Sequence, residues 1–230
     1  MISALAGEKF VRALALLLIA AVCLLLLVDA GATGASVWAK RGWFLLGLTL
    51  FLAALEVSAI YRVFHKITFA DLWLFPLLDG KWDAVLTSNW PRIRRTYETA
   101  KNGGPTFDAL VDSLTPTEEQ ERLNEAEVTF KSTLFHISMT LRPKIGNRVS
   151  RTRFARPMWR KPDLPELSYV FEQEDPDPIS QTDDRRHYGA GVIRFDPEDQ
   201  SISGEYWNNR KEAAGLNTAG TIRITRKPKP

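Results

Sequence analysis

The side chains best suited to chemistry lie near the C-terminus, within residues 201–226. Tyr206, Asn208 and Arg210 occupy alternate positions there, and Thr218 opens a second run in which apolar and polar residues alternate. An aromatic ring stacks on flat ligands, an arginine binds phosphate through two parallel hydrogen bonds, and amide and hydroxyl groups read polar edges. The pattern predicts one wall of a binding site, although a plain closing hairpin of a β domain would also explain it.

Catalytic chemistry is poorly represented in the sequence. Motifs of a P-loop, a zinc protease or a serine hydrolase are absent, and the three histidines lie far apart without the spacing of metal ligands. The single cysteine, Cys23, lies in an apolar run, so neither a disulfide framework within one chain nor a cysteine metal site is predicted. We therefore expect no enzyme activity, no metal and no cofactor.

A β-rich domain over residues 79–230 is needed to position the candidate residues. Short runs with strand patterns follow one another, separated by turn sequences such as Asp-Pro-Asp-Pro at 175–178. The predicted strands are Lys81–Thr87, Glu127–Thr133, Leu134–Arg142, Asn147–Arg156, Glu166–Glu174, His187–Asp196, Ser201–Arg210 and Thr218–Lys227. Because no helical run follows residue 125 or so, we predict a small, closed, eight-stranded antiparallel barrel whose mouth holds one small ligand.

Residues 91–123 interrupt the strand pattern between the first two strands. This stretch begins with three closely spaced arginines, Arg92, Arg94 and Arg95, and later contains Thr115 and Pro116 followed by two acidic residues. Threonine as an N-cap, proline at the first helical position and acids in the first turn are typical of a helix start. We expect an insertion made of loop and one or two short helices.

Residues 1–61 predict a helical hairpin that anchors the chain in a membrane. Ala13–Val28 is apolar and uncharged, and Trp43–Ile60 is apolar apart from Glu56. With its flanking residues the first run is long enough to span a bilayer. Basic residues outside both runs favour a cytoplasmic location for the N-terminus and for the folded domain. A cleavable secretory signal is the alternative for the first run.

Two features next to the apolar runs leave alternatives open. Glu56 is a charged residue in a predicted membrane segment, which often marks a function. It could face another subunit once helices cluster, or its carboxylate could simply reach the nearby interface. Residues 62–78 are rich in aromatic side chains and would form an interfacial linker or pack onto the folded domain.

The charge balance argues against binding to duplex nucleic acid. The chain has 30 basic and 27 acidic residues, for a formal net charge of +3. Proteins that bind a duplex through its phosphates need a strongly basic face. We therefore predict no duplex nucleic acid as a partner.

The order of these features resembles a known protein family. Two N-terminal membrane helices precede a domain that opens with Asp-Gly-Lys-Trp at 79–82 and later shows Leu-Ser-Tyr-Val-Phe-Glu at 167–172. Three short motifs follow, namely His187-x-Gly189, Gly204-x-Tyr206 and Thr218-x-Gly220. The chain resembles the two-helix, β-barrel membrane effectors of CBASS, a bacterial antiphage system that signals through cyclic oligonucleotides. The insertion at 91–123 is longer than this resemblance leads us to expect.

The resemblance implies a complete signalling role. A partner nucleotidyltransferase would make a cyclic dinucleotide during phage infection, and the cytosolic barrel would bind it. Binding would drive homo-oligomerisation, and the clustered helices would disrupt the inner membrane of the bacterium and kill the infected cell. The protein would thus be a multi-pass inner-membrane protein with its barrel in the cytoplasm.

Side-chain chemistry, rather than the resemblance, supplies the candidate ligand-binding residues. They are Tyr206, Trp207 and Trp82 for stacking on a base, Arg210, Arg94 and Arg142 for phosphate, and Asn208, His136 and Thr218 for base edges or the ribose. Tryptophans are also common in protein cores and arginines on surfaces, so a structural role stays open for each.

Two further functions remain open from the sequence. A membrane-tethered, lipocalin-like carrier of an apolar ligand would have an apolar lumen and would not depend on Arg210. A structural assembly protein would bind no nucleotide at all.

Overall fold

The computed structural model describes residues 35–70, 74–158, 163–176 and 185–227. They fall into two compact units. One contains the helices α2 (Ala35–Ala54) and α3 (Ser58–Ile67) together with Lys131–Ile137, and the other contains most of the β-structure. The predicted membrane run Ala13–Val28 lies outside the described residues.

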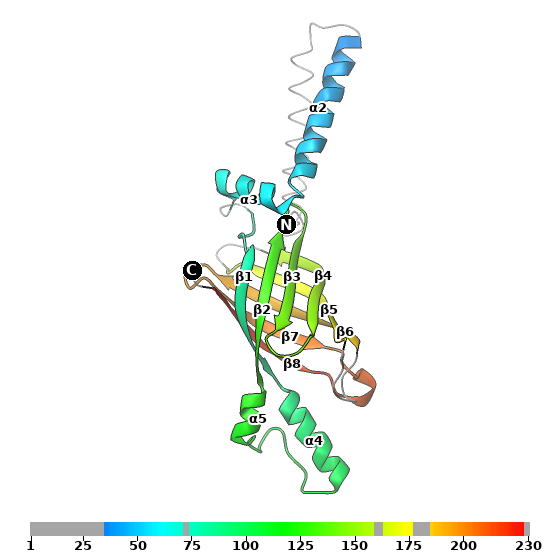
Figure 1. The fold of residues 1–230 in the computed structure, drawn as a ribbon, viewed down its shortest axis with the longest axis vertical. Coiled ribbons are helices and arrows are strands. Elements are labelled where there is room, and N and C mark those ends of the chain that lie inside the picture. The colour runs from blue at the N-terminus through cyan, green and yellow to red at the C-terminus, as the bar shows by residue number, and fades with distance from the viewer. Residues whose placement is uncertain (1–34, 71–73, 159–162, 177–184, 228–230) are drawn as a thin grey trace. The chain divides into compact units, whose positions relative to one another are not determined.

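The β-structure is a closed antiparallel barrel in which β1 pairs with both β2 and β8 (Figure 1). Its strands are β1 (Gly80–Ser88), β2 (Leu123–Ser132), β3 (Ile137–Pro143), β4 (Val149–Met158), β5 (Glu166–Glu174), β6 (Arg186–Asp196), β7 (Ser201–Asn208) and β8 (Ala219–Arg226). The strand order around the barrel follows the order in the sequence. The predicted eight-stranded antiparallel barrel is confirmed.

The turn between β2 and β3 differs from the prediction, which placed residues 133–136 in strands. The N–H of Thr133 donates to the carbonyl of His136 at 2.8 Å, and the N–H of His136 donates to the Thr133 hydroxyl at 3.0 Å. A threonine side chain therefore stabilises the turn, where glycine or proline would be the usual signal.

The two ends of the barrel lumen differ in polarity. Toward the end where β1 begins, apolar side chains fill the lumen and are at most 1% exposed. They are Trp82, Val128, Phe130, Leu167, Ile193, Ile202 and Ile224. Each such burial contributes about 1.5–3 kcal/mol to stability. The apolar end therefore acts as the core, whereas the end where β1 finishes holds polar residues among apolar ones.

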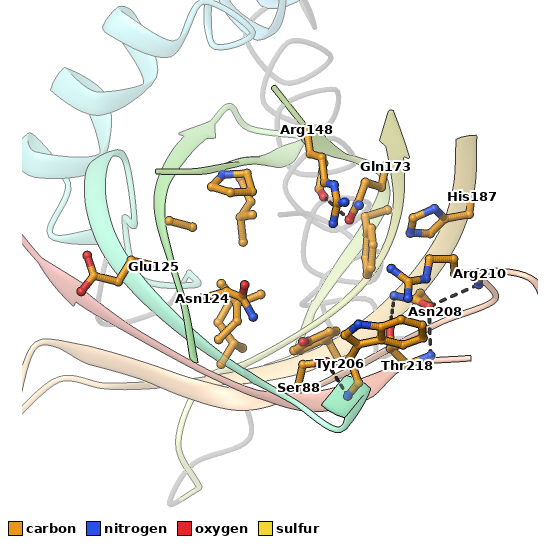
Figure 2. Close-up of a pocket in the computed structure, with 18 of the residues that line it drawn as sticks. Ser88, Asn124, Glu125, Arg148, Gln173, His187, Tyr206, Asn208, Arg210 and Thr218 are labelled. Atoms are coloured by element: carbon orange, nitrogen blue, oxygen red, sulfur yellow. Dashed lines mark hydrogen bonds between the residues drawn. The ribbon is translucent and has the colours of Figure 1, made fainter. Parts of the chain in front are cut away.

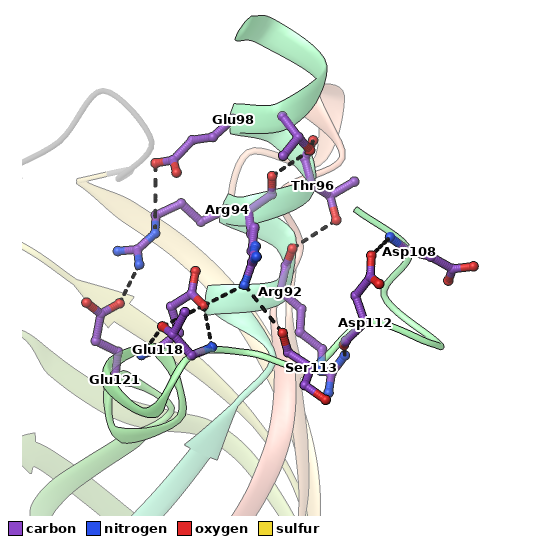
Figure 3. A network of polar contacts seen from close by, with 12 residues as sticks. Arg92, Arg94, Thr96, Glu98, Asp108, Asp112, Ser113, Glu118 and Glu121 are labelled. Carbon is purple, nitrogen blue, oxygen red and sulfur yellow. Dashed lines mark hydrogen bonds and ion pairs between the residues drawn. The ribbon is translucent and has the colours of Figure 1, made fainter. Parts of the chain in front are cut away.

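The predicted insertion between β1 and β2 contains two helices, α4 (Trp90–Asn102) and α5 (Pro116–Glu121). Thr115 caps α5 as predicted, because its hydroxyl accepts from the N–H of Glu118 and the Glu118 carboxylate accepts from the N–H of Thr115. That second bond is the main reason why the pKa of Glu118 is lowered. Arg95 contacts Glu118 at 2.9 Å and Arg94 contacts Glu121 at 2.6 Å, which ties α4 to α5 (Figure 3).

The second predicted membrane run, Trp43–Ile60, is not one continuous helix. α2 ends at Ala54 and α3 begins at Ser58, with the chain bent by 102° between them. Within the described residues no single helix is long and apolar enough to cross a membrane, although Gly42–Ala54 and Ser58–Ile67 together have a suitable length and composition.

The linker predicted at 62–78 begins inside α3. Phe75 is buried whereas Phe69 is 71% exposed, so its aromatic side chains do not share one environment. Leu72 and Trp73, which the sequence placed with them, lie outside the described residues.

An ionic cluster joins three strands at the seam where the barrel closes. The Glu127 carboxylate on β2 accepts from Lys227, which follows β8, at 2.6 Å, and it lies 3.2 Å from Lys81 on β1. The hydrogen bond from Lys227 is the main cause that lowers the pKa of Glu127, and the bond from Lys81 adds to it.

We predict that Glu127→Gln lowers the free energy of unfolding at pH 7 by well under 1 kcal/mol, because the pair is open to solvent. The folded pKa of Glu127 lies below its ordinary value of 4.5, so this stabilisation is present above that pH and is lost as the pH falls through the folded pKa. Urea unfolding at several pH values checks this, with Glu205→Gln on the exposed face of β7 as the control. A difference between wild type and Glu127→Gln that stays constant down to pH 3 or so would contradict the prediction.

Candidate functional site

A cavity of about 210 Å³ lies inside the barrel at its polar end (Figure 2). All eight strands contribute to its wall, as do Trp90, the first residue of α4, and Glu121, the last residue of α5. A drug-sized ligand usually occupies about 300–1,000 Å³. The cavity is smaller than this, with room for about one base and its sugar, and a larger ligand would extend past the mouth.

Arg210 places a positive charge in this cavity. Its guanidinium lies over the indole ring of Trp90, 4.1 Å from the ring centroid, and the residue is only 8% exposed. Trp90 is held in place by its neighbours, since its own N–H donates to the Ser88 hydroxyl and Asn89 exchanges two 2.9 Å hydrogen bonds with Ala219. A flat cation on an indole is an orientation suited to bidentate binding of phosphate.

Asn208 fixes the loop that carries Arg210. Its side-chain oxygen accepts from the N–H of Arg210 and from the N–H of Thr218, both at 3.2 Å, and its amide donates to the Thr218 hydroxyl at 2.6 Å. These bonds bring together the two ends of the β7–β8 connection, which contains a short 3-10 helix, η2 (Glu212–Ala214), between Lys211 and Gly215 in left-handed conformations. The geometry makes Asn208 and Thr218 positioning residues for Arg210.

Three aromatic rings form the floor of the cavity. They belong to Tyr169 and Phe171 on β5 and to Tyr206 on β7. A Cβ added to Gly191 would lie 2.6 Å from the Tyr169 hydroxyl, and one added to Gly189 would overlap the Phe171 ring. The β6 glycines therefore let the tips of both rings approach the strand backbone closely.

The two tyrosines of the floor stay protonated at neutral pH. Burial raises the pKa of Tyr169 far above its ordinary value of 10, and burial also raises the pKa of Tyr206. A hydrogen bond with Ser88 and the charge of Arg210 oppose the shift of Tyr206 without cancelling it. Both phenols can therefore donate hydrogen bonds to a ligand.

Another part of the cavity wall carries a second arginine and an amide. Arg148 donates to the buried carboxylate of Asp175 at 2.6 Å, and the Ser150 hydroxyl donates to Gln173 at 3.2 Å. His187, which is 5% exposed, lies beside them (Figure 2). This wall can read polar edges, while its arginine is largely neutralised by Asp175.

The acidic residues at the cavity each have a basic partner. Glu121 contacts Arg94 at 2.6 Å, and Glu125 contacts Lys144 at 2.7 Å. The hydrogen bond from Lys144 is the main cause that lowers the pKa of Glu125. Among the described residues that line the cavity, Arg210 and Arg148 carry cationic side chains.

The structure brings together four of the nine predicted ligand-binding residues. Tyr206, Asn208, Arg210 and Thr218 line the cavity. The five others lie elsewhere.

Each of those five has a structural reason for its position. Trp207, 49% exposed, and Arg142 point outward on β7 and β3, where the neighbouring positions face the lumen. Trp82 belongs to the apolar core, Arg94 pairs with acids on α4 and α5, and His136 is exposed in the β2–β3 turn. None of these five residues lines this cavity.

Glu56 also lies in a setting that the sequence did not indicate. Its carboxylate is at the bend between α2 and α3 and accepts hydrogen bonds from Thr133 and Phe135. The Glu56 carboxylate therefore connects the helix bend to a turn, and it does not lie within a continuous apolar helix.

Sequence reasoning missed several lining residues, including Trp90, Tyr169, Phe171 and Gln173. For β5 the sequence contained a usable signal. Leu167, Tyr169, Phe171 and Gln173 occupy alternate positions and so lie on one face of the strand, and the glycines of β6 leave room for the rings. Trp90 had no such signal, since its place depends on how α4 docks against β8.

No protein-family model matches this chain, and no curated protein shows significant sequence similarity to it.

Proposed function

We propose that the barrel is a sensor that binds a small anionic nucleotide, and that a cyclic dinucleotide is its ligand. The observation that carries this proposal is the Arg210 guanidinium, held over Trp90 in a lumen whose floor is aromatic. An arginine for phosphate beside aromatic faces for bases is the combination that nucleotide ligands require.

The dimensions of the cavity support a particular binding mode. A volume of about 210 Å³ admits one base with its sugar, with the base against Tyr169, Phe171 or Tyr206 and the phosphate toward Arg210. The second nucleotide would remain at the mouth, where we place Ile145 and Glu121, two exposed residues of the cavity lining. A ligand of this kind contacts the turns and the insertion as well as the floor.

The response to the ligand would take place at a membrane. In this proposal the chain is an effector of a CBASS-type antiphage system in the bacterial inner membrane, with the barrel in the cytoplasm. A partner nucleotidyltransferase supplies the ligand, binding promotes homo-oligomerisation, and the N-terminal helices disrupt the bilayer. The chain itself makes and breaks no covalent bond. Moving such a switch from about 1:99 to 99:1 requires about 5.5 kcal/mol of differential binding.

A second candidate is a carrier for an apolar ligand. It is favoured by the apolar part of the lining, namely Leu86, Met139, Leu141 and Ile222. This function would use the same cavity but would give Arg210 no role.

Isothermal titration calorimetry of the full chain in detergent tests the proposal. The panel contains cyclic dinucleotides, a linear dinucleotide, a mononucleotide and a long-chain fatty acid. We expect heat with at least one cyclic dinucleotide at micromolar concentration and weaker binding of its linear counterpart. Heat with the fatty acid alone would support the carrier, and the absence of heat with every nucleotide would refute the sensor.

A further inference from the structure

The bend between α2 and α3 lacks the usual sequence causes. The bend of 102° falls at Ala-Leu-Glu-Val-Ser, residues 54–58, where there is neither proline nor glycine. Alanine, leucine and glutamate are among the best helix formers. Sharp helix bends almost always have a local cause such as proline, a glycine–serine pair or a π-bulge. The origin of this bend must therefore be sought in contacts with other parts of the chain.

Those contacts come from the turn at residues 133–136. The Thr133 hydroxyl donates to one carboxylate oxygen of Glu56 at 3.0 Å, and the N–H of Phe135 donates to the other at 3.1 Å. Between them, the N–H of Leu134 donates to the carbonyl of Leu55 at 3.2 Å. Three consecutive residues thus bind two consecutive residues of the bend, all within one compact unit, and we call this set of contacts the Glu56 joint.

The joint occupies a group that a continuous helix would need. In an unbroken helix the carbonyl of Leu55 would accept from the N–H of Ala59, four residues later. In the bent chain that carbonyl accepts from Leu134 instead. The joint and the continuous helix therefore compete for the same acceptor.

We propose that α2 and α3 are two arms of one helix, that the Glu56 joint holds them in the bent state, and that release of the joint straightens residues 42–67. Straightening restores the helical hydrogen bonds across 55–58 and produces the combined segment whose length and composition suit a membrane span. The proposal depends on the contacts at Glu56 and does not depend on what the cavity binds.

Glu56 opposes the straight state in a second way. In a continuous helix its carboxylate would lie within the apolar run 43–60, where a charge is costly in a bilayer. In the bent state the same carboxylate accepts two hydrogen bonds. Glu56→Leu should therefore favour the straight helix on both counts. Thr133→Val removes the hydrogen bond to Glu56 together with the hydroxyl that accepts from His136 in the turn, and it leaves the helix sequence unchanged.

The test is a distance measurement by pulsed electron paramagnetic resonance on the full chain in phospholipid vesicles. Cys23 is replaced by serine, and spin labels are attached to cysteines at Leu46 and Val63, both of which are well exposed. At a rise of 1.5 Å per residue, a straight helix separates these positions by about 25 Å, and the observed bend reduces the separation to about 16 Å. Release of the joint should lengthen the distance by about 9 Å.

We expect the short distance in the parent chain and a population at the long distance in Glu56→Leu and in Thr133→Val. The matched control is Thr129→Val, the same change on the outward-facing side of β2, and it should keep the short distance. Thermal unfolding of each variant confirms that the barrel is folded. The proposal is overturned if Thr133→Val keeps only the short distance while folded, or if the parent chain shows only the long one.

Discussion

Replacing Arg210 by alanine should weaken the binding of a cyclic dinucleotide by about 100-fold. A hydrogen bond to a charged group contributes about 1.5–3 kcal/mol, and 1.4 kcal/mol corresponds to a factor of ten in the dissociation constant. Arg210 can offer two such bonds from one rigid group, because Trp90 supports its guanidinium and Asn208 fixes its backbone. The loss should show in calorimetry as a higher dissociation constant.

Two further variants separate a binding role for Arg210 from a structural one. Arg210→Lys keeps the charge but loses the flat, bidentate group, so it should restore binding only in part. Arg142→Ala removes an exposed arginine from the outer face of β3 and should leave the dissociation constant unchanged. Thermal unfolding shows whether each variant is folded. If folded Arg210→Ala binds the nucleotide as tightly as wild type does, the anion site is refuted.

The barrel could be predicted because its evidence is local. On β8, Ile222 and Ile224 alternate with polar residues, and both isoleucines are buried in the lumen. Such period-two patterns report which residues share a face, and short turns force neighbouring strands to be antiparallel. The helix start at Thr115 could be predicted for the same reason, since a cap is decided within four residues.

The site was only partly predictable, because it depends on register and docking. Tyr206 faces the cavity while Trp207, its neighbour, faces outward, and a shift of one residue would exchange them. Trp90 lies in an insertion, and hydrogen bonds between Asn89 and Ala219, which are 130 positions apart in the sequence, place it at the cavity. Composition carries no information about a contact of that kind.

The helix bend could not be predicted either, because it also involves a contact that is distant in the sequence. Residues 43–60 read as one apolar helix, and by local propensity they should form one. Glu56 meets Thr133 across 77 positions, and that contact overrides the local preference.

The largest loss of stability should follow from Gly220→Ala. Gly220 lies in β8, paired with Ser88 on one side and Tyr206 on the other. A Cβ at this position would lie 1.7 Å from the backbone carbonyl oxygen of Thr87 and 3.1 Å from the Tyr206 hydroxyl. The nearest atom belongs to the backbone of β1 and cannot rotate away, so β1 and β8 must separate at the seam that closes the barrel. We expect the substitution to lower the free energy of unfolding by about 3 kcal/mol or more, which is at the upper end of the range for overpacked cores.

Urea unfolding measures this cost, and Gly104→Ala is the matched control, because a Cβ there would meet nothing within 4 Å. The control should change the free energy of unfolding by less than about 0.5 kcal/mol, as surface substitutions usually do. Since Tyr206 adjoins the same seam, Gly220→Ala should also weaken ligand binding under conditions in which the barrel remains folded. Wild-type stability in this variant would mean that the β1–β8 seam is looser than the structure shows, and that the cavity lacks a rigid wall on that side.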